Sequence, residues 1–185
     1  MSSHTINLSN NFKIDRKELK YSVKKNGLFL EYVPSALQDE YNIVMIAVKQ
    51  NGQALKYASD KMRNVFKIVM AAVKQDGLAL EHASTELQDD NNIVTKAVQQ
   101  HGEALEYVSP RLKNSYKIVK KAVHQRPASL VYASKKLQHD RKIIKIAVKQ
   151  NEEALQYASA ELTGDKEFMM AAVKQNPIAL EYASA

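Results

Sequence analysis

The sequence predicts an all-α protein, an α-solenoid of about seven 25-residue helical repeats. Three observations predict this fold class. The string "AVKQNGQALKYAS", from Ala47 to Ser59, returns with small changes every 25 residues along the chain. Glycine and proline are scarce, at five and four residues, which argues against a turn-rich β architecture. The chain is 45% hydrophobic and 25% charged, so it can bury a core and is not a disordered tail.

The period of the repeat is constant, as three apolar columns show. Valine stands at positions 23, 48, 73, 98, 123, 148 and 173, and leucine at 30, 55, 80, 105, 130, 155 and 180. Leucine or methionine stands at 37, 62, 87, 112, 137 and 162. A constant period means that each unit stacks on the next in one geometry. The repeats start near residues 22, 47, 72, 97, 122, 147 and 172, and the last is incomplete.

Each unit is predicted to contain a long helix of about three turns. In "DDNNIVTKAVQQH", residues 89–101, Ile93, Val94, Ala97 and Val98 fall on one helical face. Short polar residues precede each long helix and are good N-caps. The predicted caps are Asp39, Asn64, Asp89 or Asp90, Asn114 or Ser115, Asp140 and Asp165.

A joint follows the long helix, at a column that holds glycine or proline, as at Gly52 and Pro127. The joint leads into a short helix with Ala79 and Leu80 inward. Ser109–Pro110 is typical of an N-cap before proline, which predicts a third, single-turn element that carries the apolar column of position 112. Glutamine recurs at positions 50, 75, 100, 125, 150 and 175. We expect these glutamines to form a ladder that hydrogen-bonds the next unit's joint.

The predicted organisation is a polar N-terminal cap at residues 1–14 and a helical repeat array at residues 15–185. No secretory signal and no run of about 20 apolar residues is present, so we expect no membrane insertion. The chain has no cysteine, which fits a reducing, cytoplasmic compartment. It stops at "EYASA" in mid-repeat without a polar cover, and we expect a trimmed chain rather than an end that docks onto a partner.

The alternation "DxxIVxxAVxxNGxALxYASxxL" resembles the helical repeats of the domain-of-unknown-function family 4116, whose usual unit is two such repeats in tandem. The resemblance runs from about Asp15 to Ala185 and is interrupted at Ser22, Pro34, Arg126 and Glu152, which weakens single joints. It implies an all-helical array found in protists, viruses and intracellular bacteria, sometimes within secreted effectors delivered into a host cell. It implies no activity, cofactor or catalytic residue.

The charge of the chain, +7 overall, is concentrated in the fourth and fifth units. Between Arg111 and Lys145 there are eleven lysines and arginines and one acid, Asp140, whereas residues 76–106 hold seven acids and Lys96. Three spaced positions of each long helix, such as 117, 120 and 124, share one face, and twelve of these 21 positions are lysine. A lysine in the last turn of a helix also interacts favourably with the negative end of the helix dipole. The competing interpretation is therefore a solvent-exposed face that stabilises the helices and binds no ligand.

These patterns predict a non-catalytic protein–protein interaction scaffold that binds an acidic partner surface. The predicted partner-binding residues are Lys113, Lys117, Lys120, Lys121, Arg126, Lys135, Lys136, Arg141, Lys142 and Lys145. The alternative is sequence-nonspecific nucleic-acid binding through the lysine-rich face, which the scarcity of arginine disfavours. A third interpretation is a spacer segment of a larger effector. The tyrosines at 32, 57, 107, 132, 157 and 182 form one column and are predicted to pack on the core.

No residue pattern in the sequence predicts an enzyme, a cofactor or a metal site. The five histidines lack the spacing of a metal site, although His101 and His124 fall at adjacent helix ends. His82 takes a tyrosine position and is predicted to be a half-buried packing residue. The recurrent serine occurs in nearly every unit, which is typical of a cap rather than of a nucleophile.

Overall fold

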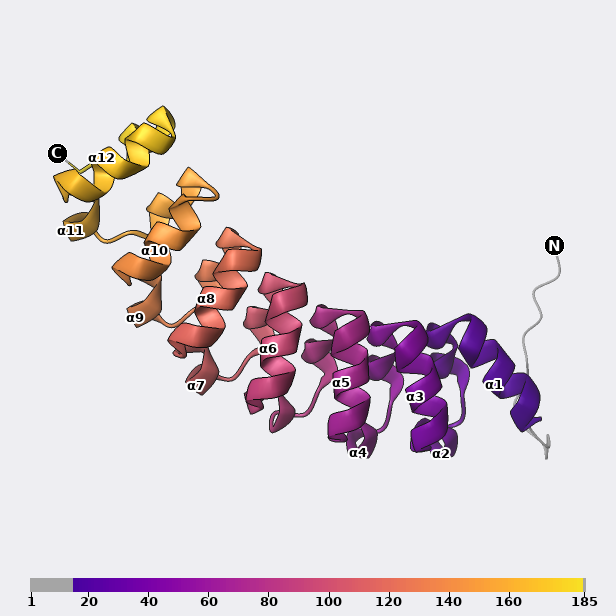
Figure 1. Ribbon diagram of the computed structural model, residues 1–185. Coiled ribbons are helices and arrows are strands. Elements are labelled where there is room, and N and C mark those ends of the chain that lie inside the picture. Colours follow the sequence, from indigo (N-terminus) through magenta and orange to yellow (C-terminus); the bar gives the residue numbers. More distant parts are fainter. Residues whose placement is uncertain (1–14, 185) are drawn as a thin grey trace.

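A computed structural model describes residues 15–184, which form an all-α repeat solenoid with no strand in that range (Figure 1). The fold class predicted from the sequence is confirmed. The predicted polar cap at residues 1–14 lies outside the described residues. No helix of the described part is long and apolar enough to cross a membrane.

Each unit contains a long α-helix, a six-residue 3₁₀ helix and, in the first six units, a short third element. The long helices are α1 (Arg16–Lys25), α3 (Tyr41–Gln50), α5 (Phe66–Gln75), α6 (Asn91–Gln100), α8 (Tyr116–Gln125), α10 (Arg141–Val148) and α12 (Lys166–Gln175). The 3₁₀ helices are η1 (Gly27–Tyr32), η2 (Gly52–Tyr57), η3 (Gly77–His82), η5 (Gly102–Tyr107), η6 (Pro127–Tyr132), η7 (Glu152–Tyr157) and η8 (Pro177–Tyr182). The short elements are α2 (Ser35–Gln38), α4 (Asp60–Arg63), η4 (Leu87–Asp89), α7 (Pro110–Lys113), α9 (Lys135–Gln138) and α11 (Ala160–Thr163).

The core is continuous along the array because each unit covers the apolar face of the one before it. On α6, Ile93, Val94, Ala97 and Val98 are all fully buried. The leucines of the 3₁₀ helices at positions 30 to 155 are at most 1% exposed. Leu180 occupies the same column in the last described unit and is 65% exposed. Burial of this leucine therefore depends on the following unit.

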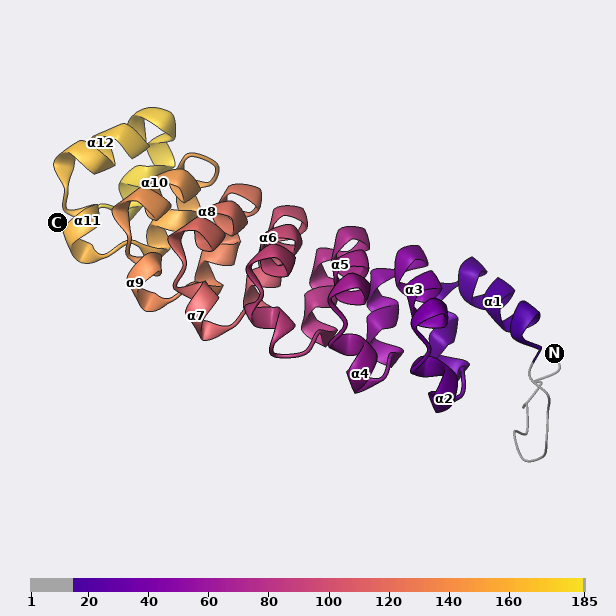
Figure 2. The same cartoon turned by 60° about the horizontal axis from the view of Figure 1, so that its bottom comes forward.

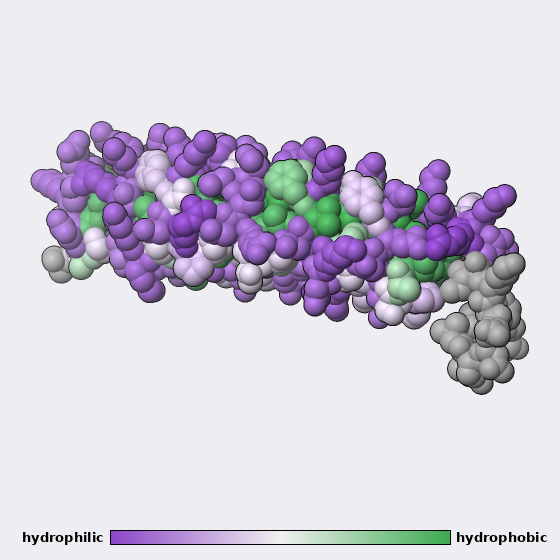
Figure 3. All heavy atoms as spheres, turned by 90° about the horizontal axis from the view of Figure 1, so that it is seen from below, coloured by the Kyte–Doolittle hydropathy of each residue, from purple (hydrophilic) through white to green (hydrophobic). Residues whose placement is uncertain are grey.

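The array is a curved rod, with the long helices side by side across it and the four-residue helices along the outer edge of the bend (Figures 1 and 2). One face, seen in Figure 3, is largely hydrophilic, with hydrophobic residues in a band that runs along the array. The exposed positions of neighbouring long helices therefore form one extended surface.

The glutamine ladder is confirmed for three glycine joints, but its bonds go to the preceding unit and not to the next one. The Gly27 amide donates to Gln50 Oε1 at 2.6 Å, and the Gly102 amide donates to Gln125 Oε1 at 2.5 Å. The Gly52 amide donates to the Gln75 side chain in the same way. The direction follows from the stacking, because the C-terminal end of each long helix packs on the joint of the preceding unit.

The N-cap predictions are correct for the aspartates directly before a long helix and wrong for the residues one position earlier. Asp90, Asp140 and Asp165 accept hydrogen bonds from backbone amides of the first turn of α6, α10 and α12. Asp39, Asn64 and Asn114 do not cap the long helices that follow. They lie one residue earlier and accept hydrogen bonds from serines of the next unit, Ser59, Ser84 and Ser134.

The recurrent serine caps the short element, as predicted, and also joins two units. Ser109 accepts from the Leu112 amide at the start of α7, where Pro110 is the first helical residue. Its hydroxyl donates to Asp89 of the preceding unit, and Arg111 Nε lies 2.9 Å from the same carboxylate. The Ser109 hydroxyl, followed by Arg111, lowers the pKa of Asp89.

This serine column makes part of the stability dependent on pH. The pKa of Asp89 is lower in the folded chain than the ordinary value of about 3.9 in an unfolded one. The stabilisation is therefore present above about pH 4 and is lost as the pH falls through the folded pKa. We expect Ser109→Ala to reduce the fall in Tm between about pH 5 and pH 2, measured by circular dichroism.

Ser134→Ala is the matched control, because the Ser134 hydroxyl donates to Asn114, which does not titrate. Each variant loses an N-cap, at a cost of about 1 kcal/mol at neutral pH. Only Ser109→Ala should change the slope of Tm against pH. Equal slopes in the two variants would contradict the role of Asp89.

Candidate functional site

The exposed side of α8 and α10 carries the densest group of cations on the long-helix surface. On α8, Ile118, Val119, Ala122 and Val123 are buried, so the remaining side of the helix faces solvent. We name the α8–α10 basic face by its seven residues, which are Lys117, Lys120, Lys121, His124, Lys142, Lys145 and Lys149. All are exposed except Lys121, which is partly buried. Within residues 15–184 none of the seven forms an ion pair.

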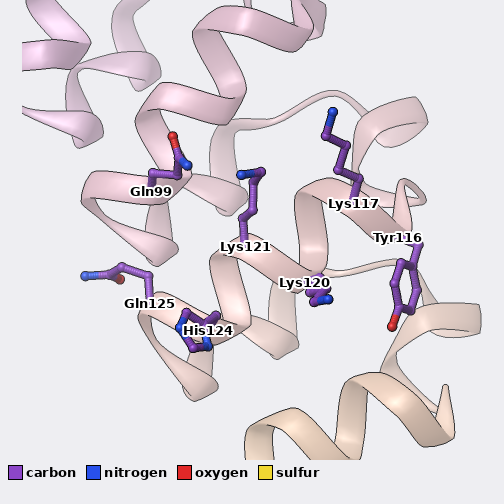
Figure 4. A pocket seen from close by; sticks show the side chains of 7 residues that line it. All are labelled: Gln99, Tyr116, Lys117, Lys120, Lys121, His124 and Gln125. Carbon is purple, nitrogen blue, oxygen red and sulfur yellow. The ribbon is translucent and has the colours of Figure 1, made fainter.

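A pocket of about 660 Å³ opens on α8, at the side of this face that adjoins α6. Lys117, Lys120 and Lys121 line it from successive turns of α8, and Gln99 reaches it from the adjoining helix α6 (Figure 4). The rest of its lining consists of Tyr116, His124 and Gln125. No acid is among these lining residues, so the pocket is a cationic hollow with one aromatic ring at its edge.

The ten predicted partner-binding residues do not all lie on one face of the array. Five of them, Lys117, Lys120, Lys121, Lys142 and Lys145, lie together on the α8–α10 basic face. Lys113, Lys135 and Lys136 lie on the four-residue helices α7 and α9, along the outer edge of the bend (Figure 1). The Lys113 ammonium donates to the Glu106 carbonyl oxygen at 2.6 Å.

The two predicted arginines are engaged between units. Arg126 Nε lies 3.2 Å from Glu103 Oε1, across the joint between the fourth and fifth units. Arg141 pairs with Asp165, which lowers the pKa of Asp165 and raises that of Arg141. The Arg141 guanidinium also lies over the Phe168 ring, 5.5 Å from its centroid. Both arginines therefore act first as contacts between neighbouring units.

The aromatic and histidine columns lie mostly against the core. Tyr57, Tyr107 and Tyr132 are partly buried, and this burial, followed by nearby glutamates, raises the pKa of each phenol. His82 is half-buried, with Nε2 3.1 Å from Gln53 Oε1, and burial lowers its pKa. The packing interpretation is confirmed for these residues. Tyr32 in the first unit differs, because its side chain is exposed.

Metal-ligating side chains do not converge in the described range. His101 lies beside Asp76, with Nδ1 3.3 Å from Oδ1, while His124 lines the pocket on α8. Residues 15–184 contain no group of three or more histidines and acids that could hold a metal ion.

A second hollow, of about 770 Å³, lies on the same surface between α3 and α5 and was missed from the sequence. We name it the α3–α5 groove; its residues are Tyr41, Met45, Lys49, Phe66, Lys67, Met70, Ala71, Lys74 and Gln75. Tyr41 is 40% exposed and Phe66 is 42% exposed. The available signal was the pair of methionines at positions 45 and 70 in adjacent units, in a column where four of the other five units have lysine or threonine and the last has Met170.

Comparison with known families gives one result that covers almost the whole chain. The model of a domain of unknown function, DUF4116, matches residues 15–63, 66–113, 92–138, 115–163 and 140–185. Each match covers about two consecutive units, and the overlaps show that the pattern recurs in successive registers. No curated protein and no solved structure matches the chain.

Proposed function

Because the chain belongs to the DUF4116 family, which is defined without a known activity, we propose from its surface that it is a non-catalytic protein-binding scaffold. The α8–α10 basic face binds an acidic surface on a protein partner. The location in a reducing compartment and a role within a secreted effector are parts of the same proposal.

The observation that carries the proposal is the gathering of six lysines on the α8–α10 basic face, none of which forms an ion pair within the described residues. Cations at the unit boundaries do have acidic partners, as in the pairs Arg16–Glu40 and Arg111–Asp89. The six lysines and His124 of the basic face have none there, so the charge of the lysines is available to a ligand.

The fold does not require lysine at these positions. In α6 the equivalent column positions hold Asn92, Thr95 and Gln99, and α6 packs between α5 and α8 like the other long helices. Interaction with the helix dipole can explain a lysine in the last turn or at the C-cap, such as Lys145 or Lys149 of α10, but not Lys117 or Lys142 in the first turn. The charge of the face therefore goes beyond what helix stability favours.

A non-catalytic role is supported by the engagement of the most repeated polar side chains. Ser59 and Ser109 each accept from a backbone amide and donate to an aspartate of the preceding unit. Gln50 and Gln125 accept from backbone amides of the joints. These repeated side chains stabilise the stack rather than present a reactive group.

The first test compares two charge-reversed variants in an affinity pull-down with nuclease present. Lys120→Glu/Lys145→Glu changes the basic face, and Lys135→Glu/Lys136→Glu makes the same charge change on α9. All four side chains are exposed, so both variants should keep the circular dichroism spectrum and the Tm of the parent. We expect the first variant to bind the recovered partner at least tenfold more weakly, and the second to bind it normally. Equal losses would show that only net charge matters.

Sequence-nonspecific nucleic-acid binding is the second candidate, favoured by the exposed ring of Tyr116 beside Lys117 and Lys120 in the pocket. Such a ring can stack on a base while lysines neutralise phosphates. In that case the material captured by the chain would vanish on nuclease treatment. The affinity of the protein for single-stranded oligonucleotides would also fall steeply as the salt concentration rises, whatever the base sequence.

A further inference from the structure

The α3–α5 groove is an apolar depression with a cationic rim. Its lining includes the large apolar side chains of Tyr41, Met45, Phe66 and Met70. Three lysines, Ala71 and Gln75 complete the lining, and no acid is among these residues. Met45 and Met70 lie partly against the core, whereas Tyr41 and Phe66 are exposed. The groove therefore presents two rings and two flexible thioethers to solvent.

Stacking of the units does not require this apolar surface, because other copies of the repeat lack it. The column of Tyr41 and Phe66 holds Asn91 in α6 and Lys166 in α12. The column of Met45 and Met70 holds Thr95 in α6 and Lys120 in α8. In a repeat array, residues that the fold needs recur in every unit, and residues that serve binding differ between units. Two adjacent units carry both apolar substitutions, which points to a ligand-binding role.

We propose that the α3–α5 groove binds an aromatic or aliphatic anchor of the same acidic protein segment that binds the α8–α10 basic face. This inference rests on the proposed function. The segment is acidic near its anchor as well, because Lys49, Lys67 and Lys74 line the groove. Buried aromatic anchors dominate the binding energy of many interfaces, and methionine adapts its shape to them.

The geometry sets the length of the segment. The groove lies between α3 and α5, and α6 separates it from α8 (Figure 1). Packed helices are about 8–10 Å apart, so α8 is about 20–25 Å from the centre of the groove. An extended chain spans about 3.3–3.6 Å per residue, which gives about seven residues between the anchor and the acidic tract. α6 lies beneath this linker and has neutral side chains at Asn92, Thr95 and Gln99.

The test uses a fluorescein-labelled synthetic peptide that joins a Phe-Leu anchor, a Gly/Ser spacer of about seven residues and a pentaglutamate tract. A second peptide has the reverse order, and two shorter peptides carry the anchor or the tract alone. We expect one of the joined peptides to bind the full chain at least tenfold more tightly than the tract alone, in fluorescence anisotropy. Joining two weak sites raises affinity because the second contact becomes intramolecular.

Variants taken from the chain's own repeats locate the anchor. Phe66→Asn and Met70→Thr place the residues of α6 at the same columns of α5, so the fold accepts them. Both should reduce binding of the joined peptide to the level of the tract alone. Met170→Thr makes the same change in the same column of α12, outside the groove, where the side chain is 51% exposed. It should leave the affinity unchanged.

The outcomes separate this inference from the proposed function. If the joined peptide and the tract bind equally, or if Met170→Thr acts like Met70→Thr, the anchor site is overturned while the basic face stands. If Lys120→Glu/Lys145→Glu does not weaken the tract alone, the basic face itself is overturned. If no peptide binds, both are overturned. A parent chain that sediments as a dimer, converted to a monomer by Phe66→Asn, would identify a second copy as the occupant and overturn the acidic segment.

Discussion

Leu105→Ala is expected to lower the free energy of unfolding by about 2–5 kcal/mol, the range of buried leucine truncations. Leu105 is fully buried in η5, between its own unit and the next one. Truncation removes apolar contacts and leaves a cavity that two packed units cannot close without moving apart. Urea denaturation followed by circular dichroism measures the loss.

Leu180→Ala is the control for this prediction, because Leu180 occupies the same column and is 65% exposed. Its truncation should change the free energy of unfolding by less than about 0.5 kcal/mol, as at other surface positions. Similar losses at Leu105 and Leu180 would contradict burial by the following unit as the cause.

Gly102→Ala is expected to lower the free energy of unfolding by about 1–3 kcal/mol, the usual cost of overpacking. A Cβ at Gly102 would lie 2.5 Å from the Ala122 carbonyl oxygen of α8 and 2.9 Å from Gln125 Oε1. Since the first contact is with backbone, α8 must move away from the fourth unit. Such a shift would also displace Lys120 and Lys121 relative to Gln99, and chemical denaturation gives the size of the loss.

Gly164→Ala is the comparison for Gly102→Ala, because Gly164 lies outside the joints. A Cβ there would meet Ser184 Oγ at 3.1 Å and the Ala160 carbonyl oxygen at 3.2 Å. The hydroxyl can rotate and the second contact is milder, so we expect a loss below about 1 kcal/mol. An equal or larger loss at Gly164 would show that the close approach at the joint is not the decisive contact.

The fifth and sixth units show what happens where the joint glycine is absent. Pro127 has no amide hydrogen, so Gln150 lacks the donor that Gln50 and Gln125 have. The Gln150 amide group instead donates to the Val123 carbonyl oxygen at 3.3 Å. α10 ends at Val148, whereas the other long helices of the described residues end two positions later in the repeat, as α8 does at Gln125. The joint therefore accepts proline, with a remodelled last turn in the following long helix.

The candidate site could be predicted from the sequence only in part. The charge count pointed to the fourth and fifth units, and five of the predicted lysines do share one face there, because lysines three and four apart lie on the same side of a helix. It could not separate Lys117 and Lys120 from Lys135 and Lys136, which lie on another edge of the array. It also could not reveal that Arg126 and Arg141 pair with acids of neighbouring units, since those partners are 23 and 24 positions away.

The sequence by itself determined the all-α fold class, the 25-residue unit, the buried columns and the serine caps. These features depend on contacts that recur within one period, so their spacing is visible in a single chain. Only the tertiary structure decided which polar residues meet between units. Asp39 and Asn114 are good caps by residue type, yet they lie one residue before the N-cap position, and stacking brings serine hydroxyls of the next unit to them instead. The α3–α5 groove likewise exists only where two long helices lie side by side, so no stretch of sequence contains it.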